Sequence, residues 1–560
     1  NAYDLEPPGE MLLKSEDGGV TWNDLTDEVQ DAINLPDDYV ELSHVATAPD
    51  DQDWVSVVGT GASGRPMVIA SNDGGGEFSY AGDMEDTSNG TFMEKVYDLA
   101  VSPEVGNIHN IAVAGVADNS EEHGSIFRLE AGTWLTGSWV DTSFYEGWDD
   151  FVSDDPSQAV IAVDFSPNFD MDDTIVCMSV DDDWLPYLQE GIWETDGSWN
   201  GEAGFPDAVQ ITNDGNELWT MAGMRSLGFA LPDDFDGTDS SANNVYLFAN
   251  AYDSVSEEVG GYVMISEDGA LSMRCGPSGD PLLASIDVHG DANTCKAMVG
   301  TYIGWDQNDP GEPVPYECCE GVAVYHTVEL DDCCPEWECA CKDPSGPYMA
   351  VVSYTPDGEK AYASTSGMLD EDYPGIGFNG GLCDESAFSV SLDDGVSFNQ
   401  VSLIDTDIDF LSDVAVCPDC GVIYLSTINT MSIRAVGGII IPGDDILPLD
   451  NGFDHMGGDF NDYAQVCACD SVWRSYDNGD TWERIYHGDW SEGMGIIDGE
   501  NGNHFDAPGQ ILLRLPCDAV DDCCDHDDAS APSGTIYMGI QNTEDLYYSR
   551  DCGQCWNQAV

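Results

Sequence analysis

Two short acidic stretches have the residue types and spacing of a calcium-binding loop. The first, Asp234-Phe-Asp236-Gly-Thr-Asp239, alternates carboxylates and then supplies a glycine for a sharp turn. The second, Asp170-Met-Asp172-Asp173, is similar, and each stretch follows a proline turn. Neither has the bidentate glutamate that closes an EF-hand, so an unliganded acidic loop remains the alternative at each. Because Ca²⁺ prefers carboxylate oxygens, the sequence predicts Ca²⁺ as a cofactor with these ligands: Asp170, Asp172, Asp173, Asp234, Asp236 and Asp239.

The cysteines indicate an oxidising, extracellular setting. The chain has 19 of them, all from Cys177 onward, which is typical of secreted proteins. Cys417-x-x-Cys420 and Cys552-x-x-Cys555 have the spacing of a zinc or redox pair, but neither has a second ligand pair at zinc spacing. We therefore expect both pairs to form local disulfides, and residues 305–345 to form a Cys-rich insertion. The cysteines expected in disulfides are Cys318, Cys319, Cys333, Cys334, Cys339, Cys341, Cys417, Cys420, Cys552 and Cys555.

Catalytic motifs are missing from the sequence. It has no Gly-x-Ser-x-Gly elbow, no P-loop and no His-Glu-x-x-His zinc motif. A glycosidase needs two carboxylates that flank the scissile bond, and the 108 acidic residues do not single out one pair. The sequence therefore predicts no enzyme and no catalytic residues, with a glycosidase as the alternative.

The composition narrows the range of partners. The 14 basic and 108 acidic residues give a formal net charge of −94. Such a field repels nucleic acid and anionic membrane surfaces and favours solubility and cation binding. No apolar run approaches the roughly 18 residues of a membrane span, so we expect no membrane insertion. The chain begins at Asn1 without Met, which indicates a processed or incomplete N-terminus.

A hairpin motif, Ser-x-Asp-x-Gly-x-Thr-Trp, recurs along the chain. One copy is Ser475–Trp482, which follows Arg474; others are Ser15–Trp22, Ser71–Phe78, Ser391–Phe398 and Ser549–Trp556. Asp can bond nearby backbone N–H groups, and Gly can take a positive φ, as a tight turn requires. The aromatic residue then starts the return strand. We expect a structural role for the aspartates of the five copies: Asp17, Asp73, Asp393, Asp477 and Asp551.

Proline turns interleave with these hairpins and complete a repeating unit. Strand-like runs end at Ser102-Pro103, Ser166-Pro167 and Thr355-Pro356, among others. The pattern therefore predicts four short antiparallel strands in each unit. A repeated four-stranded unit is typical of a β-propeller. We expect an all-β fold, a β-propeller of four-stranded antiparallel blades with about eight or nine blades. The expected organisation is a single large propeller over residues 1–560, with residues 1–26 as a partial first blade and two smaller propellers as the alternative.

The hairpins resemble the Asp-box, or BNR, repeats of sialidases, xyloglucan-cleaving glycosidases, sortilin-type receptors, a photosystem-assembly factor and bacterial cell-surface propellers. The resemblance covers nearly the whole chain at repeat level. It implies the propeller fold, and it implies that the Asp-box aspartates are structural, because in those families this hairpin lies far from the ligand site. A sialidase also needs an Arg-Ile-Pro motif before the first repeats, and this sequence lacks it.

Together these features predict a secreted or cell-surface structural or interaction protein, of the surface-layer or extracellular filament type and stabilised by Ca²⁺. Its expected partners are other protein chains, as a homo-oligomer, lattice or filament. The alternatives are a carbohydrate-active Asp-box propeller, which would bind carbohydrate, and a receptor-like ectodomain that binds basic peptides.

Overall fold

A computed structural model describes most of the first half of the chain and separate strands of the second half. The chain divides into two compact units: unit 1 is Asn1–Ala297 with Thr327–Glu336, and unit 2 is Met298–His326 with Trp337–Val560. The described residues are 12–33, 41–61, 64–118, 122–132, 135, 137–148, 157–183, 185–193, 197–200, 205, 207–211, 220–221, 227–253, 258–274, 276–278, 281–292, 294–301, 322–328, 330, 335–345, 349–366, 387–403, 410–416, 423–432, 434–436, 439–441, 464–476, 482–487, 495–497, 511–514, 536–540, 546–550, 553 and 556–558.

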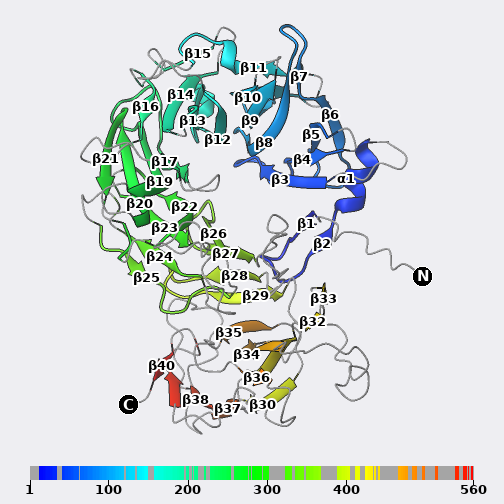
Figure 1. The fold of residues 1–560 in the computed structure, drawn as a ribbon, viewed down its shortest axis with the longest axis vertical. Helices are drawn as coiled ribbons and strands as arrows, with labels where there is room; N and C mark the ends of the chain where they lie inside the picture. Colours follow the sequence, from blue (N-terminus) through cyan, green and yellow to red (C-terminus); the bar gives the residue numbers. More distant parts are fainter. Residues whose placement is uncertain are drawn as a thin grey trace. The chain divides into compact units, whose positions relative to one another are not determined.

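Unit 1 consists of antiparallel sheets that follow one another in chain order (Figure 1). The chain starts with a two-stranded hairpin of β1 (Leu13–Lys14) and β2 (Asn23–Asp24), followed by α1 (Thr26–Ile33). The first sheet has the order β3 (Glu41–Thr47), β4 (Val55–Thr60), β5 (Pro66–Ser71), β6 (Ser79–Asp83). The second has the order β11 (Val140–Asp141), β10 (Glu122–Ala131), β9 (His109–Asp118), β8 (Thr91–Val101), β7 (Glu85–Asp86), with the 3-10 helix η1 (Thr142–Phe144) after it.

Two further sheets lie wholly in unit 1. The third has the order β12 (Ala159–Phe165), β13 (Thr174–Val180), β14 (Pro186–Ile192), β15 (Ser198–Trp199), with α2 (Phe169–Asp172) between its first strands and β16 (Val209–Gln210) on β14. The fourth has the order β17 (Thr220–Met221), β19 (Asn244–Asp253), β20 (Glu258–Glu267), β21 (Ala270–Arg274), with β18 (Leu227–Ala230) also on β19. Another sheet takes the order β22 (Leu283–His289), β23 (Lys296–Thr301), β24 (Val324–Thr327), β25 (Glu338–Cys339).

Unit 2 contains the remaining strands. One sheet of nine strands runs β26 (Met349–Tyr354), β27 (Ala361–Ser366), β28 (Ala387–Ser391), β29 (Asn399–Leu403), β35 (Glu483–His487), β34 (Ala464–Ser475), β31 (Ile423–Ser432), β30 (Phe410–Val416), with β36 (Gly495–Ile497) on β34. Its two halves join where Gln400 pairs with Arg484. A hairpin of β32 (Arg434–Val436) and β33 (Ile439–Ile441) and a sheet of β37 (Ile511–Arg514), β38 (Ile536–Ile540), β39 (Leu546–Ser549) and β40 (Asn557–Gln558) complete the set.

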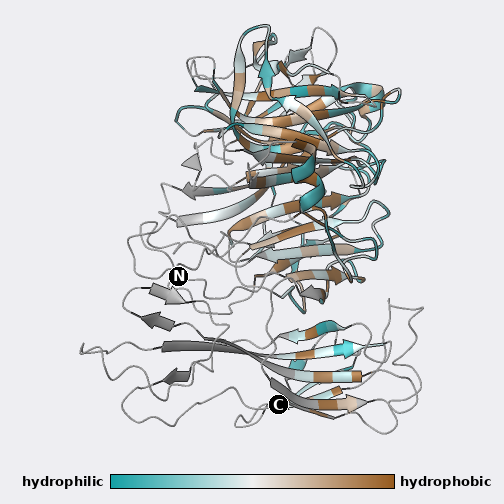
Figure 2. Ribbon diagram, turned by 90° about the vertical axis from the view of Figure 1, so that its right-hand side faces the viewer, coloured by the Kyte–Doolittle hydropathy of each residue, from teal (hydrophilic) through white to brown (hydrophobic). Residues whose placement is uncertain are grey.

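The sheets of unit 1 stack face to face, and the middle strands show how. On β9, Ile111 and Val113 pack into a core shared with the first sheet, whereas Ala112 and Ala114 pack into a core shared with the third. Side chains alternate between the two faces of a strand, so one apolar strand serves two cores. In Figure 2 the strand interiors are accordingly hydrophobic and the turns hydrophilic. Serial stacking of antiparallel sheets is the packing of a β-propeller, whereas the number of blades remains a prediction.

Unit 2 repeats this packing. Val324 of β24 and Val322 just before it share a core with Val352 and Ala363 of the nine-stranded sheet. Tyr424, Val472 and Ile485 from the other half of that sheet share a core with the last sheet, through Leu513, Ile536 and Met538. The all-β class is thus confirmed in both units.

Three of the five Ser-x-Asp-x-Gly hairpins lie in the described residues and have one hydrogen-bond pattern. Ser391 Oγ accepts from the N–H of Gly395 at 2.9 Å and donates to Asp393 Oδ1 at 2.8 Å, while Asp393 Oδ1 accepts from the N–H of Ser397 at 2.9 Å. The copies at Ser15 and Ser71 repeat these contacts. Asp17, Asp73 and Asp393 therefore hold the turn through local bonds, and Asp477 and Asp551 lie outside the described residues.

One helix was not expected from the sequence. α1 begins after Asp24, whose Oδ1 accepts from the N–H of Thr26 at 2.9 Å, and it buries Val29 against the first sheet. Its apolar residues Val29, Ala32 and Ile33 have helical spacing, but eight residues are too few for this pattern to stand out in a strand-rich chain. None of the described helices has the length and apolar character needed to cross a membrane.

Candidate functional site

The two acidic stretches meet between the third and fourth sheets. Asp172 is buried at the end of α2, and its Oδ2 accepts from Ser166 Oγ at 2.7 Å and from the N–H of Gly237 at 3.0 Å. Asn168 Nδ2 also donates to the carbonyl of Phe235 at 2.7 Å. The segment between β12 and β13 and the loop between β18 and β19 are therefore joined directly. Burial raises the pKa of Asp172, opposed by these hydrogen bonds.

A second buried carboxylate lies at this junction. Glu190 on β14 is fully buried, and Asn243 Nδ2 donates to both of its oxygens, at 3.2 Å to Oε1 and 3.0 Å to Oε2. Burial raises the pKa of Glu190 well above its usual range, and the charge of Asp172 adds to this effect. The junction thus places two carboxylates in a buried site, where desolvation disfavours their charged forms.

The other expected metal ligands mostly bond their own loops. Asp236 Oδ1 accepts from the N–H of Thr238 at 2.8 Å, and Asp239 Oδ1 accepts from the N–H of Ser241 at 3.0 Å. Asp234 Oδ1 accepts from the N–H of Ala292 at 2.7 Å. Asp170 is exposed and Asp173 ends α2 in the left-handed conformation, at φ 50°. Within the described ranges, no three His, Cys, Asp or Glu side chains gather closely enough to hold a metal.

Three aspartates from three sheets form another acidic site in unit 1. Asp98 lies on β8, Asp164 on β12 and Asp287 on β22. Asp98 Oδ2 accepts from the N–H of Val163 at 2.8 Å, so its carboxylate reaches the strand that carries Asp164. The charges of both Asp98 and Asp287 act on Asp164, so Asp164 lies within electrostatic range of each.

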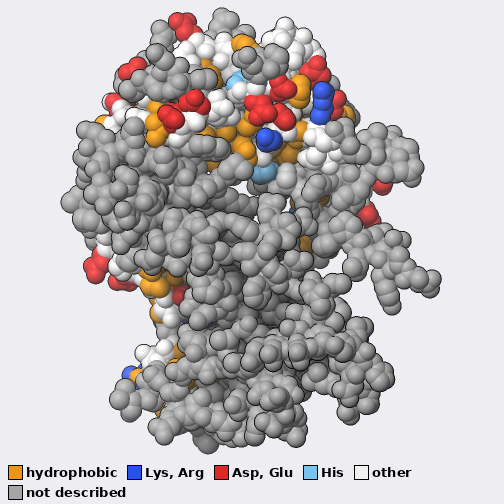
Figure 3. Space-filling model, in the orientation of Figure 1, with side chains coloured by type: hydrophobic (Ala, Val, Ile, Leu, Met, Phe, Trp, Pro, Cys, Tyr) orange, Lys and Arg blue, Asp and Glu red, His pale blue; other side chains and the backbone are white. Residues whose placement is uncertain are grey.

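The environment of these aspartates shifts their protonation. Burial raises the pKa of Asp98 to about 6, although the N–H groups of Val163 and Leu99 favour the charged form. Asp164 remains exposed to water on one side, but enclosure by the surrounding strands raises its pKa to about 7, and the two neighbouring charges contribute. Carboxylates with perturbed pKa values are common in binding and catalytic sites, although structural networks perturb them too. On the face shown in Figure 3, acidic side chains recur over the described part of unit 1.

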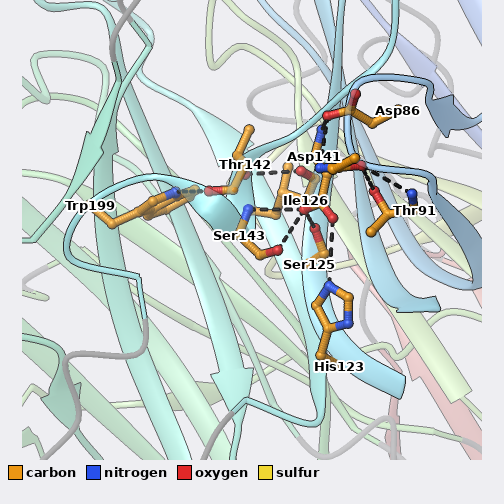
Figure 4. Close-up of polar contacts among 10 residues, drawn as sticks. Asp86, Thr91, His123, Ser125, Ile126, Asp141, Thr142, Ser143 and Trp199 are labelled. Atoms are coloured by element: carbon orange, nitrogen blue, oxygen red, sulfur yellow. Dashed lines mark hydrogen bonds and ion pairs between the residues drawn. The ribbon is translucent and has the colours of Figure 1, made fainter. Parts of the chain in front are cut away.

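A Ser, a His and an Asp also meet in the second sheet, but not as a catalytic triad (Figure 4). His123 Nε2 lies 3.5 Å from Asp141 Oδ2, and Ser125 Oγ donates to Asp141 Oδ1 at 2.5 Å. In a triad the serine bonds the histidine, whereas here Ser125 is fully buried and bonds the carboxylate. Burial opposes ionisation of Asp141, but bonds from His123, Ser125 and Ser143 outweigh it and lower the pKa. The backbone N–H of Asp141 also donates to Asp86, so this network ties the sheet together.

Two of the ten cysteines expected in disulfides lie in the described residues. Cys341 is disulfide-bonded. Cys339 is an exposed free thiol on β25, where it pairs with Tyr325 of β24. The expectation for Cys339 therefore differs from the structure, because ladder pairing opposes Cys339 to a tyrosine rather than to a cysteine. The remaining eight cysteines lie outside the described residues.

Sequence reasoning missed the residues that carry these sites: Asp98, Asp164, Asp287, Glu190 and Asn243. A usable signal exists for the aspartates, because each interrupts an apolar strand shortly before a turn, as in Asp98-Leu-Ala-Val-Ser-Pro103 and Asp164-Phe-Ser-Pro167. Glu190 and Asn243 have no comparable signal, since only the stacking of two sheets brings them together.

The comparisons with known proteins leave the family open. The sequence matches no family model and no curated protein. YCF48 from Cyanidioschyzon merolae is similar in structure at a TM-score of 0.35 and 12% identity, over 70% of this chain and 94% of that one. The BP39L lectin from Burkholderia pseudomallei has a TM-score of 0.37 and 14% identity, over 65% of this chain and 84% of the lectin. An ancestral GH74 enzyme has a TM-score of 0.27 and 11% identity, over 98% of this chain and 68% of the enzyme. Scores this low carry no argument about function.

Proposed function

We propose that this protein is a secreted or cell-surface interaction module of the β-propeller type, without enzymatic activity, that binds a cationic segment of a partner protein. The observation that carries the proposal is that Asp98 of β8 accepts a hydrogen bond from the N–H of Val163, next to Asp164 on β12, while the charge of Asp287 on β22 also acts on Asp164. Three like charges held together disfavour one another, and a cationic ligand removes that cost. The formal charge of −94 would steer such a ligand towards the protein over long range.

A lysine- and arginine-rich peptide is the appropriate probe. Its affinity for the full chain is expected to fall steeply when NaCl rises from low to physiological concentration. In the double variant D98N/D164N, the dissociation constant should rise by at least about tenfold, which corresponds to 1.4 kcal/mol. Glu16 is exposed and distant in sequence from all three aspartates, so E16Q is the control and should bind like the wild type. Equal binding by the double variant would refute the proposal.

Assembly of this module into a surface layer or filament is the extension of the proposal that the sequence favours. Divalent cations would screen the mutual repulsion between such acidic subunits. Negative-stain microscopy should then show ordered assemblies in the presence of Ca²⁺. A monodisperse monomer with and without Ca²⁺ would confine the proposal to a soluble binding module.

A carbohydrate-active role is the second candidate, and one observation favours it. Asp98 and Asp164 have pKa values of about 6 and about 7, close to what a general acid needs near neutral pH. If this role holds, the protein should release reducing sugars from β-glucans, and D164N should abolish the release. Peptide binding without sugar release favours the interaction module, whereas the opposite result favours the glycosidase.

A further inference from the structure

The junction of the two acidic loops contains an unusual set of buried oxygen atoms. Asp172 is 4% exposed and Glu190 is 0% exposed, and the charge of Asp172 acts on Glu190. Buried carboxylates are normally paired with a cation or neutralised. Here the side chain that contacts both oxygens of Glu190 is the neutral amide of Asn243.

Asn243 is the second observation that points to a ligand. Its side chain is fully buried and its amide is directed at Glu190, yet its Oδ1 atom has no hydrogen-bond partner. Its Nδ2 atom lies 3.3 Å from the carbonyl oxygen of Gly237 as well. Rotation of the amide by half a turn would place Oδ1 where Nδ2 lies, beside the carboxylate and this carbonyl. Three oxygen ligands would then converge on one point.

The space at Gly237 shows how closely the oxygens are gathered. A Cβ atom at residue 237 would lie 2.2 Å from Glu190 Oε1 and 2.5 Å from Thr174 Oγ1. No side chain fits there, so only a glycine lets the loop backbone approach Glu190 and Thr174 this closely. Together the donors are a bidentate carboxylate, an amide oxygen, a backbone carbonyl and a hydroxyl, which are the oxygen types that Ca²⁺ binds.

We propose that Glu190, the rotated amide of Asn243, the carbonyl of Gly237 and the hydroxyl of Thr174 bind one Ca²⁺ ion, with the adjacent carboxylate of Asp172 supplying further negative charge. The site needs only one ligating carboxylate, so it is compatible with the lack of any three-acid cluster among the described residues. Mg²⁺ fits less well because it demands octahedral geometry and keeps several waters. The ion would join the third and fourth sheets through Glu190 of β14 and the loop before β19.

The competing account is that Glu190 holds a proton instead of facing a cation. The two accounts differ for E190Q, because glutamine is isosteric with a protonated carboxyl but is a poor Ca²⁺ ligand. After removal of divalent ions with EDTA, Ca²⁺ uptake by the full chain is measured by titration calorimetry and equilibrium dialysis. E190Q should lose one equivalent of bound Ca²⁺ or bind it at least about tenfold more weakly. The control is E16Q, which removes an exposed carboxylate far from this junction in the sequence, and its uptake should equal that of the wild type.

A second variant keeps the test decisive if E190Q does not fold. N243D places another carboxylate at the ligand position, so Ca²⁺ should bind more tightly and the thermal midpoint should rise more on Ca²⁺ addition than in the wild type. If Glu190 only holds a proton, N243D is destabilised equally with and without Ca²⁺. Unchanged Ca²⁺ uptake by E190Q, or a Ca²⁺-independent N243D, would overturn the proposal. Equal uptake by wild type and E190Q together with intact peptide binding would leave the proposed function standing.

Discussion

The backbone N–H of Gly237 donates a 3.0 Å hydrogen bond to the buried carboxylate of Asp172, 65 residues earlier in the chain. Asp172 ends α2, between β12 and β13 of the third sheet, and Gly237 lies in the loop between β18 and β19 of the fourth sheet. Loops at corresponding positions of the repeat thus hold neighbouring sheets together by polar contacts as well as through the apolar core. The same junction brings Glu190 and Asn243 into contact.

Asp172 should therefore contribute to stability independently of any cation. Its Oδ1 accepts from the N–H of Thr174 and its Oδ2 from Ser166 and Gly237. In D172N, an NH₂ group replaces one acceptor and faces a donor, so the free energy of unfolding in EDTA should fall by about 1–3 kcal/mol. Urea denaturation measures the change. D170N is the control, and an equal loss there would show that loop charge rather than the hydrogen bonds is responsible.

The recurrent hairpin gives a second prediction. Asp393 accepts bonds from both Ser391 and Ser397, including one from Ser397 Oγ at 2.7 Å. D393A should lower the free energy of unfolding by about 1–3 kcal/mol, because the turn N–H groups lose their acceptor. The exposed Glu359 of the same unit provides the control E359A, which should leave the urea midpoint unchanged. A midpoint for D393A equal to that of E359A would contradict a structural role for the hairpin aspartate.

Asp164 on β12 predicts that the stability of the fold depends on pH. The pKa of Asp164 is raised to about 7 in the folded chain, so between about pH 4 and pH 7 the folded state binds more protons than the unfolded state. The stability from Asp164 is thus present at low pH and is lost as the pH rises towards 7. D164N should flatten the slope of thermal midpoint against pH over this window. An unchanged slope would show that other groups control it.

The sequence predicts the architecture far better than it predicts the site. The hairpin pattern is local, so Ser391, Asp393 and Gly395 could be interpreted from their spacing alone, and the structure shows the expected turn. Local spacing also indicates Asp172 and Asp236 as metal ligands, but the contact between their loops depends on the stacking of two sheets. Glu190 and Asn243 come from different repeats and meet only through that stacking. A pattern within one repeat cannot specify contacts between repeats.

Two glycines allow backbone strain to be separated from steric overlap. Gly147 and Gly82 both have positive φ, at 86° and 91°. A Cβ at Gly147 would lie 1.7 Å from the carbonyl oxygen of Trp199, whereas one at Gly82 would meet nothing within 4 Å. G82A should cost about 1–2 kcal/mol from strain alone, and G147A should cost about 1–3 kcal/mol more because backbone atoms must move. Similar thermal midpoints for the two variants would contradict the close approach of Gly147 to Trp199.

The buried ion pair of Arg474 and Glu483 in unit 2 gives the last prediction. Arg474 Nε lies 2.6 Å from Glu483 Oε1, and the two side chains are only 2% and 17% exposed. E483Q removes the charge that compensates a buried guanidinium, and the free energy of unfolding should fall by about 3–5 kcal/mol. The comparison is E16Q, which breaks the pair of Lys14 and Glu16 at 3.1 Å on the surface. Exposed pairs contribute about 0–1 kcal/mol, so E16Q should leave the urea midpoint nearly unchanged. Both substitutions remove the glutamate charge from an ion pair, one buried and one exposed, so equal losses would show that burial does not govern the strength of the Arg474 pair.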